Sequence, residues 1–456
     1  MSGCHLCVHG HFYQPPRADP FTGIIPRELD AAPYANWNER ITAECYAPIA
    51  EAGYFEHISF NMGGTLARWL EGYDARVYGR IVESERACYA AHGVGNGVAQ
   101  PVHHTILPLA RRRDKICQVR WGIASFEHRF GHAPEGMWLP EMAVDMETLE
   151  VLASEGIRFT ILSDEQVRGN LDAGAGPYRV RLPSGADMAV FVRDRHLSNA
   201  LSFTMPDPAF IDDWLRGQVD WRCRRGGLVL IATDGETFGH HHRQGIGVLG
   251  GILRSGAAHG YALTTLGRYM REHPPEMELE VVGDTAWSCA HRLSRWVVGC
   301  GCTSGDSRWK GALRRALDNL ASNLDDAYED ETKKFGLDTW RLRDDYIAVL
   351  LGRMDQDAFL AEKGLAHLSS NERQRLLQLL EAQLFRQRMY TSCTFFFEDL
   401  DRYEPRYAIA SAIRALALTL YATGVDLSAG FRRDLRVAVS ERSGQTGASL
   451  FDALIK

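Results

Sequence analysis

Two carboxylates stand where buried apolar runs of the sequence end in polar residues. Glu141 follows the run Gly136–Leu139, and Asp234 follows the run Leu228–Thr233. Since a parallel barrel gathers the carboxyl ends of its strands at one mouth, we expect the two acids to converge there. Hydrolysis of a glycosidic bond requires such a pair: one attacks the anomeric carbon, and the other acts first as acid and then as base. One acid alone would fit a helix N-terminus equally well, but the pair favours a catalytic site.

Side chains that suit sugar rings and sugar hydroxyls accompany these acids. Aromatic rings offer flat apolar faces, while histidines and amides bind hydroxyl groups. Three consecutive residues of a helix cannot share one face, so we expect at least one of Phe395–Phe397 to point toward the barrel mouth. The predicted substrate-binding residues are His9, His11, Gln14, His103, His104, Trp138, Glu236, His240, His291 and Phe396.

The histidines also allow a second hypothesis, a metal-dependent hydrolase or deacetylase of a carbohydrate. His9, His11 and His240 could form a zinc site together with a carboxylate. A metal site at a barrel mouth usually needs an aspartate near the first strand, whereas Gln14 and Pro15 stand there. We therefore expect no metal in the catalytic site and no cofactor. A catalytically silent sugar-binding protein is a third hypothesis, and the presence of both acids argues against it.

A separate group of metal-ligating residues lies further along the chain. Cys289 and His291 are followed by Cys300 and Cys302, and together they could close a tetrahedral site, although the spacing is not that of a standard zinc finger. We favour the interpretation that the cysteines pack in a turn at a domain junction and that His291 reaches the active site. The 10 cysteines of the chain fit reduced thiols or metal ligands better than a disulfide framework.

Short apolar runs that alternate with helical segments must position the predicted site. Strands separated by helices indicate right-handed βαβ units and a parallel sheet. No G-x-G-x-x-G follows the first run, and polar residues follow several runs, so we favour an incomplete seven-stranded (β/α) barrel over an open doubly wound sheet. The predicted strands are Cys4–Val8, His57–Phe60, Gly95–Ala99, Gly136–Leu139, Arg158–Leu162, Met188–Val192 and Leu228–Thr233. The predicted helices between them include Val144–Ser154 and Phe210–Arg216.

After about residue 285 the pattern changes to long amphipathic helices. Ser369 and Glu372 have the spacing of a capping box, and Gly424 is a plausible helix C-cap. The apolar positions recur at steps of three and four: Leu313, Leu317, Leu320, Leu324 and Tyr328, then Ile409, Ile413, Leu416 and Leu420. We predict a catalytic barrel over residues 1–285 and an α-helical bundle over residues 286–456 that packs against the barrel mouth.

The composition of the chain argues against several classes of function. The 456 residues are 45% hydrophobic and 24% charged, which is typical of a globular chain with a large core. The formal net charge of −7 argues against a nucleic-acid partner. No apolar run approaches the roughly 20 residues of a membrane helix, and the first residues lack the pattern of a secretory signal. We therefore expect a cytoplasmic protein that does not bind membranes.

Four segments, in this order, resemble signatures of glycoside hydrolase family 57: His9–Pro15, Gly97–Pro108, Trp138–Glu141 and Asp234–His240. The resemblance implies an incomplete seven-stranded (β/α) barrel and a retaining mechanism on α-glucosidic bonds of oligo- or polysaccharides. It also implies that Glu141 is the nucleophile, that Asp234 is the acid/base, and that no metal cofactor is used. The carboxyl groups of these two acids should then lie about 5 to 5.5 Å apart.

The helical half and two departures from the common signatures leave the substrate and the exact reaction open. The helical half is similar to a branch of the family with a helical C-terminal domain of unknown function. Two departures from the common signatures are present: Phe12 and Tyr13 separate His11 from Gln14, and Phe395–Phe397 replaces a Trp-rich motif. Hydrolysis, transfer to another glucan and branching share one covalent intermediate, so the sequence leaves these three reactions open.

Overall fold

The computed structural model describes residues 3–223 and 227–455, and these form two compact units. The first unit comprises Met1–Gln14, Arg27–Val102 and Ser125–Trp287. The second unit comprises Pro15–Pro26, His103–Ala124 and Ser288–Lys456. The predicted division into residues 1–285 and 286–456 uses a single boundary, whereas two N-terminal segments belong to the second unit. Residues 1, 2, 224–226 and 456 of the predicted domains lie outside the described residues.

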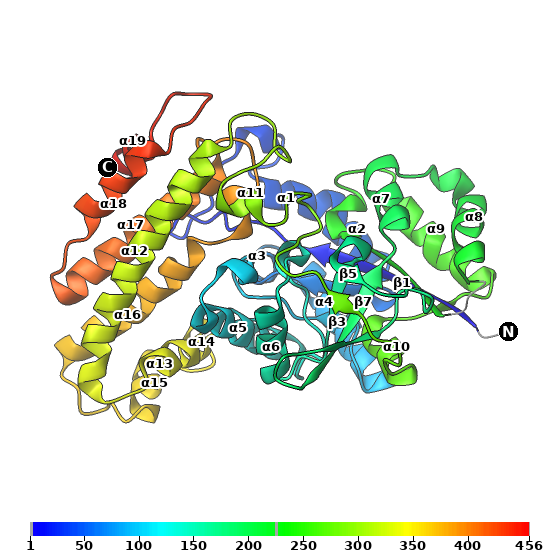
Figure 1. Ribbon diagram of the computed structural model, residues 1–456, viewed down its shortest axis with the longest axis horizontal. Helices are drawn as coiled ribbons and strands as arrows, with labels where there is room; N and C mark the ends of the chain where they lie inside the picture. The colour runs from blue at the N-terminus through cyan, green and yellow to red at the C-terminus, as the bar shows by residue number, and fades with distance from the viewer. Residues whose placement is uncertain (1–2, 224–226, 456) are drawn as a thin grey trace. The chain divides into compact units, whose positions relative to one another are not determined.

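A parallel sheet at the centre of the first unit has β1 (Cys4–Phe12) between two neighbours, β2 (Ser59–Met62) and β8 (Gly227–Asp234) (Figure 1). β2 pairs in turn with β3 (Gly97–Val98), and β9 (Ala262–Leu263) pairs with the start of β1. All of these pairings are parallel. The register places one residue of β1, His11, beside Asn61 on one neighbour and Asp234 on the other.

The sheet continues on its other side through residues 136–138. Ala99 pairs with Met137, and Gly136 pairs with Phe159 at the start of β4 (Phe159–Ser163). β4 runs parallel to β7 (Asp187–Arg193). Beyond β7, the Asp194 N–H donates to the Leu230 carbonyl on β8 at 2.9 Å. The series of neighbouring strands that begins at β8 therefore leads back to β8. The predicted (β/α) barrel is confirmed.

The barrel is incomplete between β7 and β8 because another segment enters there. The Val192 N–H donates to the Ala175 carbonyl, and the Ala175 N–H donates to the Leu228 carbonyl, both at 2.9 Å. An antiparallel strand absent from the sequence prediction, β6 (Tyr178–Arg181), also pairs with β7. Another short antiparallel pair joins β5 (Val167–Arg168) to β10 (Glu280–Val281). These additions lie outside the parallel path, which is why strand–helix alternation did not predict them.

Helices fill the connections of the first unit. Acidic side chains cap several of them: Asp145 accepts from the Thr148 N–H at 2.7 Å, and Asp194 accepts from the Leu197 N–H at 2.9 Å. The two helices predicted between the strands correspond to α6 and α8. The helices are α1 (Trp37–Ile41), α2 (Ala47–Glu51), α3 (Gly64–Tyr73), α4 (Ala75–His92), α6 (Met146–Ser154), α7 (Arg195–Thr204), α8 (Ile211–Cys223), α9 (Gly245–Ala258) and α10 (Leu266–Glu272). α5 (Arg112–Phe130) begins in the second unit and ends in the first.

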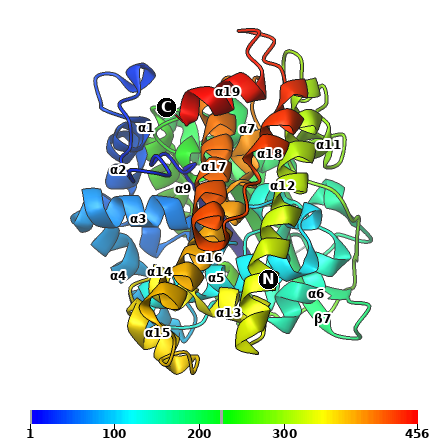
Figure 2. The same ribbon diagram turned by 90° about the vertical axis from the view of Figure 1, so that its left-hand side faces the viewer.

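The second unit is helical, as predicted, and is built on three long helices that pack side by side (Figure 2). These are α12 (Arg308–Thr332), α16 (Ser370–Arg388) and α17 (Tyr403–Thr423). The shorter helices are α11 (Ser294–Val297), α13 (Thr339–Asp345), α14 (Ile347–Leu350), α15 (Gln356–Glu362), α18 (Ser428–Asp434) and α19 (Gly447–Leu454).

The predicted helix ends and most of the predicted apolar stripes are confirmed. The Ser369 N–H donates to Glu372 Oε2 at 2.8 Å and the Glu372 N–H donates to Ser369 Oγ at 3.4 Å, which is a reciprocal capping box. Gly424 ends α17 with a φ of 78°. The five apolar residues predicted on α12 are all buried. On α17, however, Leu420 is 44% exposed, because it lies on the solvent-facing side of the helix with Ala417 and Tyr421, while Ala422 of the same turn is buried.

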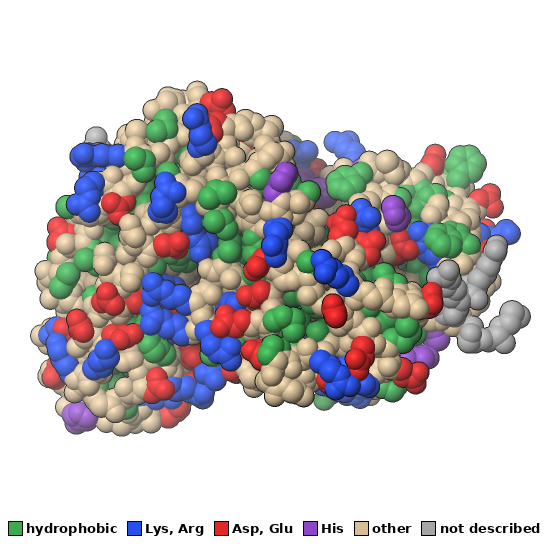
Figure 3. Space-filling model, in the orientation of Figure 1, with side chains coloured by type: hydrophobic (Ala, Val, Ile, Leu, Met, Phe, Trp, Pro, Cys, Tyr) green, Lys and Arg blue, Asp and Glu red, His purple; other side chains and the backbone are tan. Residues whose placement is uncertain are grey.

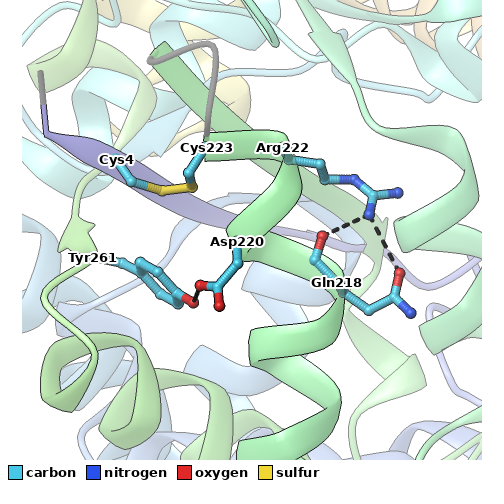
Figure 4. Close-up of a disulfide and its surroundings, with 6 residues drawn as sticks. All are labelled: Cys4, Gln218, Asp220, Arg222, Cys223 and Tyr261. Carbon is cyan, nitrogen blue, oxygen red and sulfur yellow. Dashed lines mark hydrogen bonds between the residues drawn. A yellow bond between two sulfur atoms is a disulfide. The ribbon is translucent and has the colours of Figure 1, made fainter. Parts of the chain in front are cut away.

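One pair of cysteines differs from the expectation of reduced thiols. Cys4 at the start of β1 and Cys223 at the end of α8 form a disulfide (Figure 4), and the other eight cysteines are thiols. The two meet because β1 pairs with β8, the strand that follows α8, with Cys4 opposite Gly227. Because the two cysteines are separated by 219 residues, their pairing could not be predicted from the sequence. Among the described residues, no helix is long and apolar enough to cross a membrane.

Candidate functional site

The first unit positions Glu141 on a strained turn just after residues 136–138. Glu141 has φ 57° and ψ 20°, a left-handed conformation that a residue with a side chain adopts at a cost. A neighbouring segment holds this turn in place, because the Trp287 N–H donates to the Glu141 carbonyl at 3.0 Å. The Trp287 indole Nε1–H also donates to Glu141 Oε2 at 3.2 Å. The Glu141 side chain is therefore oriented while remaining partly exposed.

Asp234 is the last residue of β8, in register with His11 of β1. The next residue, Gly235, packs so closely on Phe12 that a Cβ there would overlap the aromatic ring. Glycine thus lets the chain turn immediately after Asp234, which leaves this carboxyl at the strand end. Asp234, like Glu141, is only partly exposed.

The two acids interact electrostatically. Burial, followed by the negative charge of Glu141, raises the pKa of Asp234 to about 7, and the cation of Arg193 opposes this rise. The Arg193 guanidinium lies 4.8 Å from the centre of the Trp287 ring and donates to the Ala232 carbonyl at 3.2 Å. A carboxyl group with a pKa near 7 is able both to donate a proton and to take one back in neutral solution.

Glu236 is buried and bonded on the same side of the barrel. It accepts hydrogen bonds from Tyr46 Oη at 2.6 Å, from the Tyr13 N–H at 3.2 Å and from Gln14 Nε2 at 3.5 Å. Burial and the nearby charge of Asp234 raise the pKa of Glu236 to about 8. Glu236 and Gln14 are each 5% exposed and bond to each other and to Tyr46, and their contact with substrate stays a prediction.

A stack of rings lies beside the catalytic acids. His9 and His11 both stack on Trp138, with ring centres 5.1 and 4.7 Å from the indole. Asn61 joins the two histidines, since its Oδ1 lies 3.1 Å from His9 Nε2 and its Nδ2 lies 2.8 Å from His11 Nδ1. Burial lowers the pKa of His9 to about 3 and that of His11 to about 4, so both rings are neutral at pH 7.

Two members of this stack were predicted to bind substrate. Trp138 and His9 are fully buried, and their contact with substrate stays a prediction. Their packing fixes His11, which is 5% exposed. Asn61 was missed by the sequence analysis. Its position directly after the predicted strand His57–Phe60 was the available signal, because polar residues at strand ends line a barrel mouth.

The hypothesis of a metal-dependent hydrolase requires His240 to bind zinc together with His9 and His11. In the structure, His240 contacts other residues. Its Nδ1 lies 2.6 Å from Glu44 Oε2, and its ring meets Trp37 edge to face. Among the described residues, the group that could hold a metal ion consists of Cys289, His291, Cys300 and Cys302, hereafter the Cys3His cluster. The described histidines of the barrel therefore do not support the hypothesis of a metal-dependent hydrolase.

Four of the predicted substrate-binding residues belong to the second unit. His104 Nδ1 lies 2.6 Å from Ser392 Oγ and the residue is 1% exposed, while His103 packs edge to face on Trp121. His291 is part of the Cys3His cluster, and the Arg295 guanidinium lies 4.3 Å from the ring centre of Phe396. His104 is thus buried and His291 lies against Cys302, and the contact of these residues with substrate stays a prediction.

Comparison with known proteins identifies the family of this chain. The sequence profile of glycosyl hydrolase family 57 matches residues 29–282, which is more than half of the chain and includes both Glu141 and Asp234. The chain belongs to glycosyl hydrolase family 57. In this family 57 chain, residues 306–456 also match a domain of unknown function (DUF3536), as the resemblance to a helical branch of the family implied.

Named relatives of this family 57 chain act on α-glucans. Alpha-amylase 1 of Dictyoglomus thermophilum is 24% identical, over 44% of this chain and 29% of its own length. The 1,4-alpha-glucan branching enzyme of Thermococcus kodakarensis is 22% identical, over 42% of this chain and 40% of its own length. The chain thus spans less than half the length of these relatives. A solved structure, the exo-type maltose-forming amylase of Pyrococcus sp. ST04, shares the fold with a TM-score of 0.78 at 16% identity, over 99% of this chain and 88% of that one.

Proposed function

We propose that this family 57 chain is a retaining glycosidase or transglycosidase that cleaves α-glucosidic bonds of oligo- or polysaccharides. The observation that carries the proposal is the electrostatic pairing of the two strand-end acids: burial and the charge of Glu141 raise the pKa of Asp234 to about 7. The names of the relatives support α-glucan as the substrate class. A polysaccharide or oligosaccharide is the expected partner.

The first chemical step follows from the different surroundings of the two acids. Glu141, oriented by the Trp287 indole N–H, attacks the anomeric carbon with a carboxylate oxygen. The bond from that carbon to the glycosidic oxygen breaks, and Asp234 transfers its proton to the departing oxygen. The products are a glycosyl ester on Glu141, a released sugar or glucan, and an ionised Asp234.

The second step uses the change in charge that the first step causes. Once Glu141 is esterified, its negative charge no longer raises the pKa of Asp234, so Asp234 becomes a base. Asp234 takes a proton from water or from an acceptor hydroxyl, whose oxygen attacks the anomeric carbon and breaks the ester. Water gives hydrolysis, whereas a glucan hydroxyl gives transfer or branching, so the exclusion of water from the site selects the reaction.

The proposed function is tested by Glu141→Gln. Glutamine keeps the shape of the side chain but removes the attacking charge, so turnover of a soluble α-glucan should fall at least about 10³-fold. Glu83→Gln, which replaces an exposed carboxylate on α4, is the matched control and should retain activity. Reducing-end release and chromatography of products from maltooligosaccharides measure the effect. Near-normal activity in a folded Glu141→Gln protein would contradict the proposal.

We also infer that the enzyme works in the cytoplasm, without a nucleic-acid partner. Eight of the 10 cysteines lie outside the Cys4–Cys223 disulfide, and this excess of thiols supports a reducing compartment. The net charge of −7, with basic and acidic side chains interspersed on the face drawn in Figure 3, supports the absence of a nucleic-acid surface. Cell fractionation with an antibody to the chain tests the location, and a membrane or extracellular pool would contradict it.

A further inference from the structure

The Cys3His cluster brings four potential metal ligands together in the second unit. One ligand atom from each of the four residues lies within 4.8 Å of all the others. Cys289 Sγ lies 3.7 Å from Cys300 Sγ and 4.0 Å from Cys302 Sγ. His291 Nδ1 lies 3.3 Å from Cys302 Sγ. The ligands come from two short pairs, Cys-x-His and Cys-x-Cys, on either side of helix α11.

These separations match a tetrahedral zinc site. With Zn–S bonds of about 2.3 Å and Zn–N bonds of about 2.0–2.1 Å, tetrahedral geometry separates two sulfurs by about 3.8 Å and a sulfur from a nitrogen by about 3.5 Å. The observed sulfur–sulfur and sulfur–nitrogen distances lie close to these values. We propose that the Cys3His cluster binds one Zn²⁺ ion.

The composition of the cluster selects the metal and its role. Soft thiolate ligands with one imidazole, in a tetrahedral set, favour zinc over the harder cations that oxygen ligands bind. Four protein ligands leave no open position for a substrate or water, so the ion is structural rather than catalytic. A disulfide is a poorer explanation, because its sulfurs would lie about 2.05 Å apart and a third cysteine and the histidine would have no role.

Groups around the sulfurs suit negatively charged ligands. The backbone N–H groups of His291 and Arg295 donate to the Cys289 sulfur, and that of Ala290 donates to the Cys302 sulfur. The buried ammonium of Lys310, on α12, donates to the hydroxyl of Thr303, the residue after Cys302, at 3.1 Å. Such second contacts orient metal ligands, and the cation offsets the excess negative charge of three thiolates around one divalent ion.

The local chain explains why a metal would be useful here. Residues 288–307 contain one four-residue helix, α11, and otherwise turns and irregular backbone. Gly299 has φ 87°, and a Cβ there would overlap Ser307, so the segment folds tightly on itself. With little regular hydrogen bonding, the segment gains its order from side-chain contacts. A bound ion would fasten its two ends together just before α12 begins, and metal binding would then add directly to folding stability.

The test measures metal in the full reduced chain, not activity, so its outcome is independent of the proposed function. We expect about one zinc per chain by elemental analysis after purification from zinc-supplemented medium. Replacement of the zinc by Co²⁺ should give the visible bands of tetrahedral cobalt and the near-ultraviolet thiolate-to-cobalt charge-transfer band. Sub-stoichiometric metal that dialysis removes, or a cobalt spectrum without the thiolate band, would overturn the proposal.

Three variants locate the ion. Cys300→Ser should lower the zinc content at least about tenfold, because it removes one of four ligands. Cys302→His should keep the metal while weakening the thiolate-to-cobalt band, since histidine also ligates zinc; this variant serves if Cys300→Ser does not fold. Cys88→Ser, which replaces a partly buried free cysteine of the first unit, is the matched control and should keep both zinc and spectrum. Equal zinc in all three variants, with unchanged cobalt spectra, would overturn the assignment.

Discussion

At the scale of single residues, the two proposed catalytic carboxyls differ because their neighbours differ. The Trp287 indole donates to Glu141 Oε2 and so orients this carboxyl group. Asp234 is placed where burial and the charge of Glu141 raise its pKa to about 7. The division of roles between the acids therefore follows from environment, since both are simple carboxylic acids.

Asp234→Asn tests the role of the proton donor. Asparagine cannot protonate the glycosidic oxygen, so kcat/KM for α-glucans should fall about 10²–10⁴-fold. Aryl glycosides with good leaving groups need little protonation and should lose much less in the first step. Parallel kinetics on maltooligosaccharides and on an activated aryl α-glucoside measure the difference. Equal losses on both substrates would show that the acid is another residue, with Glu236 the first to examine.

Glu236→Gln tests whether the pKa of the buried Glu236 is raised, because a raised pKa makes the free energy of unfolding depend on pH. With a pKa of about 8, against an ordinary value of 4.5, the folded chain holds a proton that the unfolded chain releases. The free energy of unfolding of the natural chain therefore falls as the pH rises from about 4.5 to 8. Glutamine does not ionise, so the variant should gain stability relative to the natural chain over this window, by a few kcal/mol at most.

Urea unfolding at pH 5 and pH 8 measures that gain. The exposed Glu83→Gln is the control, and its stability relative to the natural chain should change little between the two pH values. A difference between Glu236→Gln and the natural chain that does not depend on pH would show that Glu236 is ionised in the folded protein.

At the scale of elements, the parallel strands were predictable because each is marked by a local run of apolar residues. The additional strand β6 and the disulfide were not predictable. β-branched and apolar runs marked the parallel strands to within a few residues, as for β4, expected at Arg158–Leu162 and found at Phe159–Ser163. Strand β6 escaped because it belongs to a hairpin outside the βαβ alternation. The Cys4–Cys223 disulfide escaped because it depends on the pairing of β1 with β8.

Ser369→Ala tests an element of the helical unit whose origin is visible in the sequence. The substitution removes the hydroxyl that caps α16, so the free energy of unfolding should fall by about 1 kcal/mol. Ser370→Ala, one residue further along and equally exposed, is the matched control and should change stability much less. Denaturant titrations of both variants measure the difference, and equal stabilities would refute the capping role.

At the scale of the whole molecule, the place of the two acids was predictable while much of their surroundings was not. The position of Glu141 and Asp234 at strand ends could be inferred from order along the chain, because a parallel barrel turns that order into proximity. The contacts of Tyr46 with Glu236 and of Asn61 with two histidines join distant segments through side-chain packing. The burial of Trp138 and His9 depends on the same packing and could not be predicted from the sequence.

The central claim is double displacement by Glu141 and Asp234, and the configuration of the first-formed product tests it most directly. A proton NMR time course of maltooligosaccharide cleavage distinguishes the two anomers before they equilibrate. Attack by Glu141 and then by water inverts the anomeric carbon twice, so the account predicts that the α-anomer appears first. The two carboxyl groups should correspondingly lie about 5 to 5.5 Å apart when substrate is bound. Appearance of the β-anomer first would contradict the account, because a single displacement by water would then be the mechanism.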